Sequence, residues 1–497
     1  MSNELWEKFI QPGDEREMSR LQNLINGVWI DSVSKEEEQV LNPATGEIVA
    51  TVPLSTVDEV EKAVEAAQAA FESWSRTPVP KRARVLFRYW QLLQEHEQAL
   101  ATLITKENGK SYKEALGEVL RGIECVEFAA GAPSHMMGST LANISADMDS
   151  ELFRVPLGVI GGITPFNFPM MVPCWMFPLA IACGNTFVLK PSERTPLTAM
   201  KLAALFQEAG LPNGVLNVVH GAHDVVNTLT TTPNVKAISF VGSQPVAKYV
   251  YEKASASGKR VQALAGAKNY HIVMPDAHVE KSVENIIMSS FGSAGERCMA
   301  CSAVVVVGDG DAFMKTLLDE AAHMVLGNGL MDEVTLTPII RGEQRSRIEV
   351  YIDKGKEEGG RALLDGRKGA GAFGGRFFLG RYDFDQVKPQ MAIAKEEIFG
   401  PVLSVFRADQ LEDALVLVNQ SRFGNSAVIY TENAKAVRKF REEVEAGMLG
   451  VNVGVPAPMA FFPFSGWKDS FYGDLHANGK DGVEFYTKKK MITSRYF

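Results

Sequence analysis

Between positions 155 and 266, two kinds of stretch alternate, which differ in the spacing of their hydrophobic residues. Short runs of consecutive apolar residues predict buried strands, and longer segments with apolar residues at helical spacing predict helices between them. The strands are expected within VPLGVIGGITPF (155–166), NTFVLKPSE (185–193), VLNVVHG (215–221), VKAISFVGS (235–243) and VQALAG (261–266), and the helices over 170–183, over 196–209 and from about residue 244. Strands that alternate with helices of this length are typical of a right-handed, doubly wound parallel sheet. The pattern therefore predicts an α/β protein with a Rossmann-type sheet.

The first 150 residues follow a different pattern, in which a strand pair precedes long amphipathic helices. We expect a polar arm over residues 1–20, strands around 27–30 and 47–53 joined through the turn-rich segment 42–46, and helices from residue 55, after residue 80 and over about 111–130. Thr56 and Glu59 have the spacing of a capping box at the start of the first helix. Arg121 lies in the third helix, where a solvated surface charge is the commoner interpretation of an arginine.

Composition limits the classes of protein that this chain can represent. At 497 residues it exceeds a single hydrophobic core, so about two or three domains are expected. With a net charge of -9, the chain lacks the excess of basic residues that is typical of nucleic-acid-binding proteins. No apolar stretch is long enough to cross a bilayer, and the N-terminus has neither a signal nor a transit pattern. Five cysteines, an odd number in so long a chain, favour a reducing compartment, so we expect a cytosolic protein.

Polar residues follow three of the predicted strands at their carboxyl ends, which is where doubly wound sheets bind ligands. These ends carry Thr164, Phe166 and Asn167, then Lys190, Ser192 and Glu193, then Gly242 and Ser243. Gly242 and Ser243 precede a helix start that suits a pyrophosphate, although G-x-G-x-x-G spacing is absent. A carboxylate such as Glu193 beside a ribose favours NAD over NADP, and the Asn167 amide could donate to an oxyanion. Taken singly, each is more often a turn residue or a helix cap.

The stretch FGSAGERCMACS (291–302) places Cys298 on a glycine-punctuated loop before the apolar run AVVVVG (303–308). The neighbouring Arg297 favours the thiolate, which is the nucleophilic form of cysteine. The alternative is a small buried hydrophobic residue, which is what most cysteines are. Cys298 and Cys301 also form a C-x-x-C, but without a second pair or a histidine cluster a metal site is not expected. Cys301 is interpreted as a packed small residue, and the alternative is a partner that captures Cys298 in a disulfide under oxidation.

Together, ITPFNFP, VLKPSE, FVGS, the Cys298 loop and EEIFGP (396–401) resemble, in this order, the NAD(P)-dependent aldehyde dehydrogenase superfamily. The resemblance runs from about residue 23 to 486, and it is strongest to the CoA-acylating methylmalonate-semialdehyde dehydrogenase branch. It implies Cys298 as the nucleophile, with its backbone N–H and Asn167 as the oxyanion hole. It also implies a cofactor site for NAD formed by Thr164, Phe166, Lys190, Ser192, Glu193, Gly242, Ser243, Glu397 and Phe399. Arg121 and Arg297 match positions that bind the substrate carboxylate, for which a bidentate guanidinium is well suited.

One departure from the superfamily pattern concerns the second half of the reaction. Hydrolytic members carry a glutamate that activates water, and here the equivalent stretch, ALAGAK (263–268), has Leu264 in its place. Leucine cannot act as a general base, so the acyl group is expected to pass to CoA instead. The predicted reaction oxidises malonate or methylmalonate semialdehyde with NAD, loses CO2 and gives acetyl-CoA or propionyl-CoA. A hydrolytic aldehyde dehydrogenase and a non-catalytic binding protein on the same fold are the alternatives.

The resemblance also implies a division of the chain into three parts. The NAD-binding domain is expected over residues 1–138, 155–264 and 449–476, and the catalytic domain over 265–448. An oligomerisation arm is expected from residues 139–154 and 477–497, because the tail has an alternating pattern suited to strand addition. A homodimer or homotetramer follows from that arm. The glycine-rich RKGAGAFGGR (367–376) lacks the GK[ST] of a phosphate loop and is interpreted as a turn and strand edge.

Overall fold

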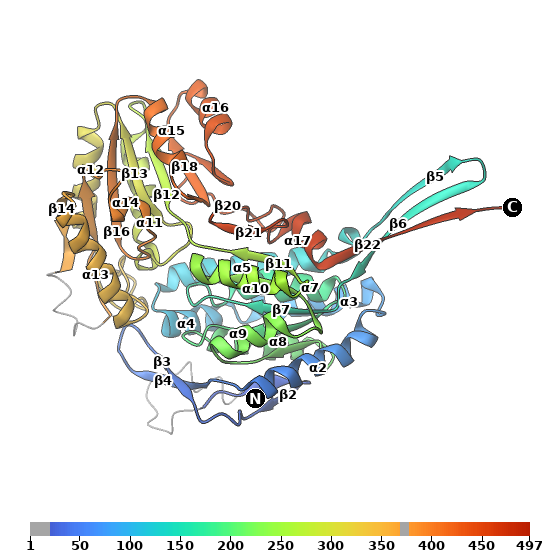
Figure 1. The fold of residues 1–497 in the computed structure, drawn as a ribbon. Helices are drawn as coiled ribbons and strands as arrows, with labels where there is room; N and C mark the ends of the chain where they lie inside the picture. Colours follow the sequence, from blue (N-terminus) through green and yellow to red (C-terminus); the bar gives the residue numbers. More distant parts are fainter. Residues whose placement is uncertain (1–19, 368–376) are drawn as a thin grey trace.

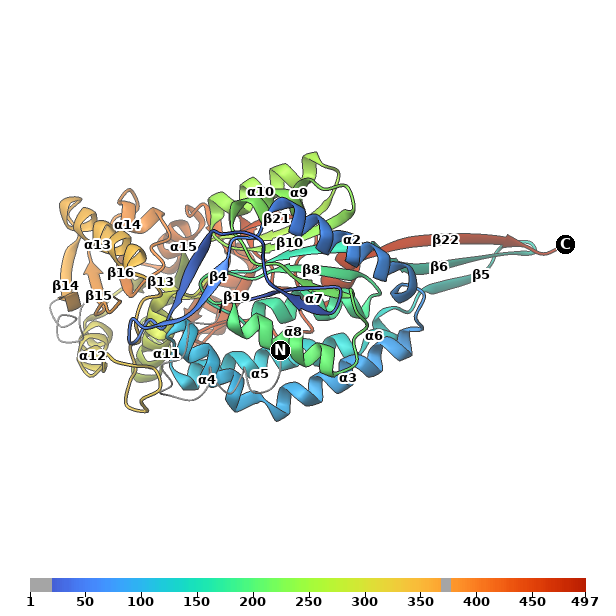
Figure 2. The same ribbon diagram turned by 90° about the horizontal axis from the view of Figure 1, so that it is seen from below.

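The computed structural model describes residues 20–367 and 377–497 (Figure 1). The predicted polar arm, apart from its last residue, and most of the glycine-rich segment at 367–376 lie outside the described residues. Within the described part, two large sheets form two lobes, and a narrow three-stranded sheet projects from one of them (Figures 1 and 2). The predicted α/β architecture is confirmed.

The first large sheet has eight strands in the order β2-β1-β9-β8-β7-β10-β11-β21. Its strands are β1 (Asn23–Ile25), β2 (Val28–Ile30), β7 (Val159–Ile163), β8 (Thr186–Lys190), β9 (Leu216–Val218), β10 (Val235–Val241), β11 (Arg260–Leu264) and β21 (Phe471–Gly473). The five strands from β7 to β11 are parallel and almost wholly buried, because helices cover both faces. The doubly wound sheet that the hydrophobic pattern predicts is therefore present.

The helices of this lobe pack on the sheet and on one another along apolar faces. They are α2 (Val57–Trp74), α3 (Val79–Glu95), α4 (Glu97–Asn108), α5 (Tyr112–Ala130), α6 (Ala132–His135), α7 (Met171–Ala182), α8 (Leu197–Glu208), α9 (His223–Thr231), α10 (Gln244–Ala256) and α17 (Gly479–Tyr486). Helix α2 begins with the predicted capping box of Thr56 and Glu59, and α5 has a second one formed by Ser111 and Glu114. Helix α7 is buried on all sides, so it carries no polar face to reveal its orientation.

The predicted pairing of residues 27–30 with 47–53 is wrong. Strand β2 pairs with β1 through the two-residue turn Asn26-Gly27, where both residues have positive φ. Asn-Gly is the preferred sequence for such a hairpin turn, and this signal was missed. The turn at 42–46 instead joins β3 (Glu37–Leu41) to β4 (Ile48–Pro53), which form a separate ribbon.

The second large sheet has seven strands in the order β14-β15-β16-β13-β12-β18-β19. They are β12 (Asn269–Val273), β13 (Cys301–Val307), β14 (Arg361–Asp365), β15 (Tyr382–Asp385), β16 (Val402–Ala408), β18 (Ser426–Tyr430) and β19 (Met448–Val451). Its helices are α11 (Val279–Phe291), α12 (Asp311–Ala322), α13 (Gly342–Glu357), α14 (Ala392–Lys395), α15 (Leu411–Asn419) and α16 (Ala434–Glu443). A two-stranded ribbon of β17 (Phe423–Gly424) and β20 (Trp467–Lys468) leads back to the first lobe.

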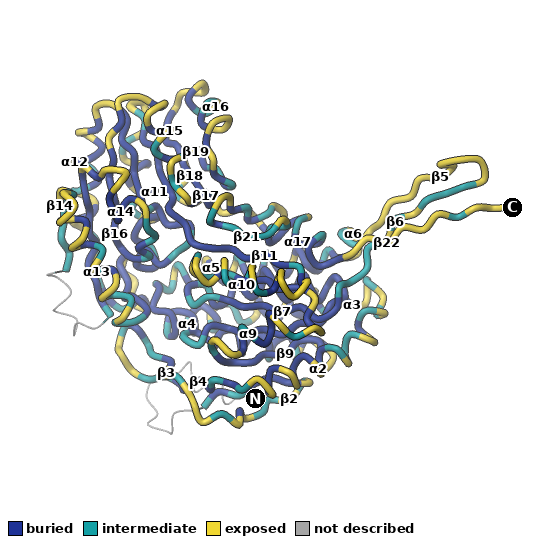
Figure 3. Tube along the Cα trace, viewed as in Figure 1, coloured by how far each residue is buried: buried dark blue, intermediate teal, exposed yellow. Residues whose placement is uncertain are grey.

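The projecting sheet consists of β5 (Ser139–Ser145), β6 (Met148–Pro156) and β22 (Thr487–Arg495), all antiparallel. Figure 3 shows it as a mostly exposed extension, whereas the strands of the two lobes are buried. Helix α17 packs against the first lobe, and its Val483 and Phe485 belong to that lobe's core. Among the described residues, no helix combines the length and hydrophobicity of a membrane span.

Candidate active site

The loop that carries Cys298 connects α11 to β13 and begins with a left-handed turn. Ser293, Ala294 and Gly295 all have positive φ. A second turn at Cys298, closed by the Ala300 N–H donating to the Arg297 carbonyl at 3.1 Å, precedes the buried strand. Gly295 has a second requirement besides its φ of 73°, since a Cβ there would lie 2.3 Å from the carbonyl oxygen of Gly400. The absence of a side chain therefore lets the cysteine loop lie against the EEIFGP segment.

Two asparagine amides fix the backbone at Cys298. Asn269 Nδ2 donates to the Cys298 carbonyl at 2.9 Å and also to the Ala300 carbonyl at 2.9 Å, and Asn425 Nδ2 donates to the Cys298 carbonyl at 3.2 Å. The loop is thus tied to β12 and to the residue that precedes β18 in the second sheet. Neither asparagine was identified from the sequence, because each is distant along the chain and acts through a backbone oxygen.

The protonation of Cys298 differs from the sequence-based expectation. Burial, followed by the nearby Glu397 carboxylate, raises the pKa of the Cys298 thiol to about 12, and Arg297 lowers it by less. The Arg297 guanidinium is directed elsewhere: it donates to the carbonyls of Met288 and Ser289 and lies 3.9 Å from Glu114. Arg297 thus favours the thiolate, as predicted, but burial and the Glu397 carboxylate outweigh it.

Asn167 is held from both sides at the end of β7. Its side-chain amide donates to the Glu296 carbonyl at 2.9 Å, which connects it to the cysteine loop, and its own carbonyl accepts from Lys110 Nζ at 2.7 Å. Lys110 also donates to Glu118 at 2.6 Å, and its ammonium lies 4.2 Å from the centre of the Phe168 ring. These contacts fix the Asn167 amide beside the loop of Cys298.

Lys110 and Glu118 were not found by sequence reasoning, yet both are almost fully buried. Glu118 uses its second oxygen to accept the backbone N–H groups of Met170 and Met171, where α7 begins. A lysine after a helix and a glutamate within one are usually solvated, so no local pattern distinguishes this buried pair. The pair fixes the α7 end that follows Asn167.

Replacing Lys110 with methionine should therefore destabilise the protein by about 3–5 kcal/mol, because Glu118 would be left as an uncompensated buried charge. Denaturant unfolding would measure the change, with Lys81→Met on the exposed face of α3 as a control that loses the same charge. The double variant Lys110→Met with Glu118→Leu should recover part of the loss. Equal stability of Lys110→Met and the parent protein would show that the ion pair does not stabilise this region.

A cavity of about 780 Å³ opens at the carboxyl ends of the parallel strands and reaches Cys298. It gathers all of the residues predicted for the cofactor, namely Thr164, Phe166, Lys190, Ser192, Glu193, Gly242, Ser243, Glu397 and Phe399, and it also contains Asn167. Lys190 Nζ donates to Glu193 at 2.8 Å, so the two side chains form an ion pair at the end of β8. Leu264 lines the same cavity and is 4% exposed.

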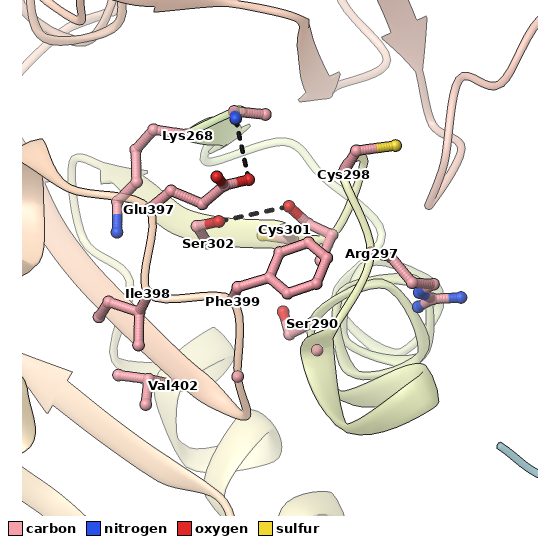
Figure 4. Close-up of a pocket in the computed structure, with 14 residues that line it drawn as sticks. Lys268, Ser290, Arg297, Cys298, Cys301, Ser302, Glu397, Ile398, Phe399 and Val402 are labelled. Carbon is pink, nitrogen blue, oxygen red and sulfur yellow. Dashed lines mark hydrogen bonds between the residues drawn. The ribbon is translucent and has the colours of Figure 1, made fainter. Parts of the chain in front are cut away.

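The EEIFGP segment lines one side of this cavity. Figure 4 shows Glu397 and Phe399 of this segment beside the cysteine loop, around a smaller pocket that Lys268, Ser290 and Cys301 also line. Glu397 accepts the Ala267 backbone N–H at 3.0 Å, and burial raises its pKa to about 7. In the view of Figure 4 the Cys298 sulfur extends away from this carboxylate. Phe399 has a positive φ of 58°, and its ring meets that of Phe166 edge-on at 5.9 Å. Gln344 supports the turn by donating to the Phe399 carbonyl at 2.8 Å.

A second cavity of about 350 Å³ also reaches Cys298. It is lined by one face of α5, by the cysteine loop and by residues 455–464, and it contains both Arg121 and Arg297. Phe168, Trp175 and Phe464 line both cavities together with Cys298. The thiol therefore lies where a long cavity at the sheet edge meets a smaller cavity that carries two arginines.

The C-x-x-C cysteines occupy different environments. Cys298 is partly accessible, whereas Cys301 is buried in β13 with its thiol near the Ala303 carbonyl. Among the described residues, no group of three or more histidine, cysteine, aspartate or glutamate side chains is placed to hold a metal ion.

Comparison with known proteins shows similarity along nearly the whole chain. The chain is 64% identical over 480 residues to malonate-semialdehyde dehydrogenase 1 of Geobacillus kaustophilus, covering 97% of this chain and 98% of that protein. It is 63% identical over 478 residues to malonate-semialdehyde dehydrogenase of Halalkalibacterium halodurans, with 96% and 98% covered.

Solved structures agree with these similarities. The methylmalonate-semialdehyde dehydrogenase from Oceanimonas doudoroffii superposes with a TM-score of 0.95 at 45% identity, covering 96% of this chain and 99% of that one. A Sinorhizobium meliloti protein assigned as methylmalonate-semialdehyde dehydrogenase, solved with NAD, gives 0.94 at 42% identity, with 97% and 99% covered. The profile of the aldehyde dehydrogenase family matches residues 29–492. Since sequence and fold agree over almost the full length, the chain belongs to the aldehyde dehydrogenase family.

Proposed function

We propose that this protein is an NAD-dependent, CoA-acylating dehydrogenase of malonate or methylmalonate semialdehyde. The proposal rests above all on the position of Cys298 between two cavities, one lined by the predicted cofactor residues and the other by Arg121 and Arg297. The names of the relatives support the same substrate class. Leu264, buried at the position of the hydrolytic glutamate, favours transfer to CoA over hydrolysis.

The residues of the larger cavity fit a dinucleotide. Gly242 and Ser243 precede α10, whose first backbone N–H groups suit a pyrophosphate. Lys190 and Glu193 at the end of β8 suit ribose hydroxyls, and Glu397 with Phe399 would hold the nicotinamide end nearest Cys298. NAD, when bound there, supplies the hydride acceptor that aldehyde oxidation requires.

The residues around Cys298 would perform the chemistry of the first step. The thiolate adds to the aldehyde carbon, and the resulting oxyanion is stabilised by the Asn167 amide, which is already fixed within reach of the cysteine loop. Burial raises the pKa of the Cys298 thiol, so the thiol must give up its proton before it attacks the aldehyde. Loss of hydride from the thiohemiacetal leaves an acyl thioester on Cys298.

The carboxylate of the substrate determines the next step. In a β-carboxy thioester the bond between the α-carbon and the carboxylate can break, because the thioester carbonyl accepts the electron pair as an enolate. CO2 leaves and a proton from solvent completes an acetyl or propionyl group on Cys298. The CoA thiolate then attacks this carbonyl, Cys298 leaves as a thiolate, and acetyl-CoA or propionyl-CoA is formed.

The same proposal covers domains, assembly and location. The eight-stranded lobe would bind NAD, the seven-stranded lobe would carry the nucleophile, and the arm of β5, β6 and β22 would join copies of the chain. The arm presents exposed apolar side chains, including Leu141, Phe153 and Met491, and open strand edges. A homodimer or homotetramer in the cytosol follows from these features and from the cysteine usage.

Replacing Arg121 with leucine should impair the natural substrate selectively. We expect the loss of transition-state stabilisation, calculated from kcat/KM, to be about 1.5–3 kcal/mol larger for methylmalonate semialdehyde than for propanal. Only the semialdehyde presents a carboxylate to the guanidinium. Steady-state kinetics with both aldehydes would measure the difference. Arg297→Leu should show the same selectivity with an added loss for both aldehydes, because Arg297 also holds carbonyls at the end of α11. Equal losses for both aldehydes in Arg121→Leu would assign that arginine a structural role.

Product analysis tests the proposed function directly. Purified enzyme with malonate semialdehyde, NAD and CoA should give acetyl-CoA, CO2 and NADH in equal amounts. Malonate as the product, formed at the same rate with or without CoA, would support the hydrolytic alternative. The enzyme heated to inactivation serves as the blank for spontaneous decarboxylation of the substrate.

A further inference from the structure

The smaller cavity contains three basic and three acidic side chains, and they are paired one to one. The pairs are Lys110 with Glu118 at 2.6 Å, Arg121 with Glu124 at 2.8 Å, and Arg297 with Glu114 at 3.9 Å. Each cation in the cavity therefore already has a carboxylate partner before any substrate enters. A cavity that binds an anionic substrate by positive charge alone would not be expected to neutralise all of its cations.

The three pairs differ in how firmly the cation is held. Lys110 is buried and has three contacts, to Glu118, the Asn167 carbonyl and the Phe168 ring. Arg297 donates to two helix carbonyls besides its carboxylate. Arg121 is different: its side chain is 42% exposed, and Glu124 is its one hydrogen-bond partner among the described residues. Arg121 is therefore the cation that loses the fewest contacts when it exchanges its partner.

Glu124 is fixed independently of Arg121. Its Oε2 accepts from Arg121 Nη1, and its Oε1 accepts the backbone N–H of Ala460 at 2.8 Å. Ala460 belongs to the segment 455–464 that forms the far wall of the cavity. The carboxylate thus stays in place when the guanidinium turns toward another anion.

We propose that Glu124 is a positioning residue that serves as the exchangeable counter-ion of Arg121 during the reaction. It pairs with Arg121 in the empty site, gives up part of that contact when the substrate carboxylate binds, and takes it back when the carboxylate leaves as CO2. The inference rests on the proposed function, because only a substrate that decarboxylates removes an anion from the cavity during turnover.

The physical reason is the cost of an unpaired charge in a confined site. When the bond to the carboxylate breaks, its electron pair stays on the thioester enolate, neutral CO2 departs, and a proton from solvent neutralises the carbon. Arg121 then loses its substrate partner. With Glu124 in place, the guanidinium remains paired at this moment, so departure of the carboxylate leaves no unpaired charge in the cavity.

Glu124→Gln tests the proposal, because glutamine keeps an oxygen for the Ala460 N–H but removes the charge. Glu127→Gln is the matched control: Glu127 lies on the exposed face of the same helix, and the same charge is lost. In Glu124→Gln, competitive inhibition by propionate should strengthen roughly 3- to 10-fold, since the ligand becomes the counter-ion of Arg121. Glu127→Gln should leave inhibition unchanged within about twofold.

The second readout is the decarboxylation step itself. Single-turnover release of CO2 from carboxyl-labelled malonate semialdehyde should slow roughly 3- to 10-fold in Glu124→Gln, because departure of the anion now leaves Arg121 unpaired. Oxidation of propanal should be unchanged within about twofold. Glu124→Asp, which keeps the charge, should bind propionate as the parent enzyme does, and it serves as the conservative variant if Glu124→Gln folds poorly.

Two outcomes would overturn the proposal. Weaker propionate inhibition in Glu124→Gln would mean that Glu124 merely orients Arg121, and equal losses with propanal and malonate semialdehyde would mean that it only supports the fold. Failure of the proposed function is recognised separately, because the parent enzyme would then release no CO2 in a CoA-dependent cycle. Competitive inhibition by propionate can be measured with any aldehyde that the enzyme oxidises, so this readout keeps its meaning in that case.

Discussion

Cys298→Ala should abolish aldehyde-dependent NADH formation, with a loss of more than about 10⁴-fold in kcat. The thiol is the nucleophile of the proposed mechanism, and alanine offers no group that could add to the aldehyde carbon. NAD affinity should stay within about threefold of the parent enzyme, because the predicted cofactor contacts lie on other elements of the larger cavity. Fluorescence titration with NAD and a steady-state assay with malonate semialdehyde would measure the two quantities.

Cys301→Ala provides the matched control for this experiment. Cys301 is buried in β13 and has no chemical step in the mechanism, so most of the activity should remain. Turnover like that of the parent enzyme in Cys298→Ala would contradict the mechanism. A strong loss of NAD binding in Cys298→Ala would instead indicate that the loop had lost its structure, which the thermal melting of the two variants would reveal.

Omission of CoA should change the time course of NADH formation from steady turnover to a burst. Each active site should form one NADH rapidly and then continue about 10²–10⁴ times more slowly, because Leu264 cannot activate water for attack on the thioester. Addition of CoA should restore turnover with ping-pong kinetics, since the acyl-enzyme forms before its acceptor is needed. Stopped-flow absorbance at fixed semialdehyde, with and without CoA, would measure both phases.

Introduction of the missing carboxylate gives the reciprocal test. Leu264→Glu should increase the rate of the slow phase of NADH formation without CoA. Because the position is buried, the variant should also be less stable unless water solvates the new side chain. Leu264→Gln is its control, since it brings a polar group of similar size that is no base. A linear trace without CoA at the rate seen with saturating CoA, with free acid as product, would falsify the acylating assignment.

The pattern of apolar and polar residues was enough to predict the architecture and to assign most of the candidate site residues to one sheet edge. Runs of apolar residues in alternation with helical periodicity report which faces are buried, and burial of both strand faces requires a covered parallel sheet. Because ligands bind at the carboxyl ends of such strands, Asn167, Lys190 and Gly242 could be assigned to a common edge before any coordinates. The structure places all three in one cavity. The ordered motifs likewise indicated the family, which the comparisons confirm.

Which distant residues come into contact, and how their charges change one another's pKa values, could be learned only from the three-dimensional fold. The buried pair of Lys110 and Glu118 could not be predicted, because nothing local distinguishes it from solvated helix charges. The predicted effect of Arg297 on Cys298 has the right direction, but larger opposing effects could not be predicted from the neighbouring residue. A pKa depends on burial and on charges through space, and here Glu397, far along the chain, and the enclosing walls outweigh the adjacent guanidinium. The partner of β2 was missed for a different reason, since a two-residue Asn-Gly turn is a local signal that a longer turn-rich segment obscured.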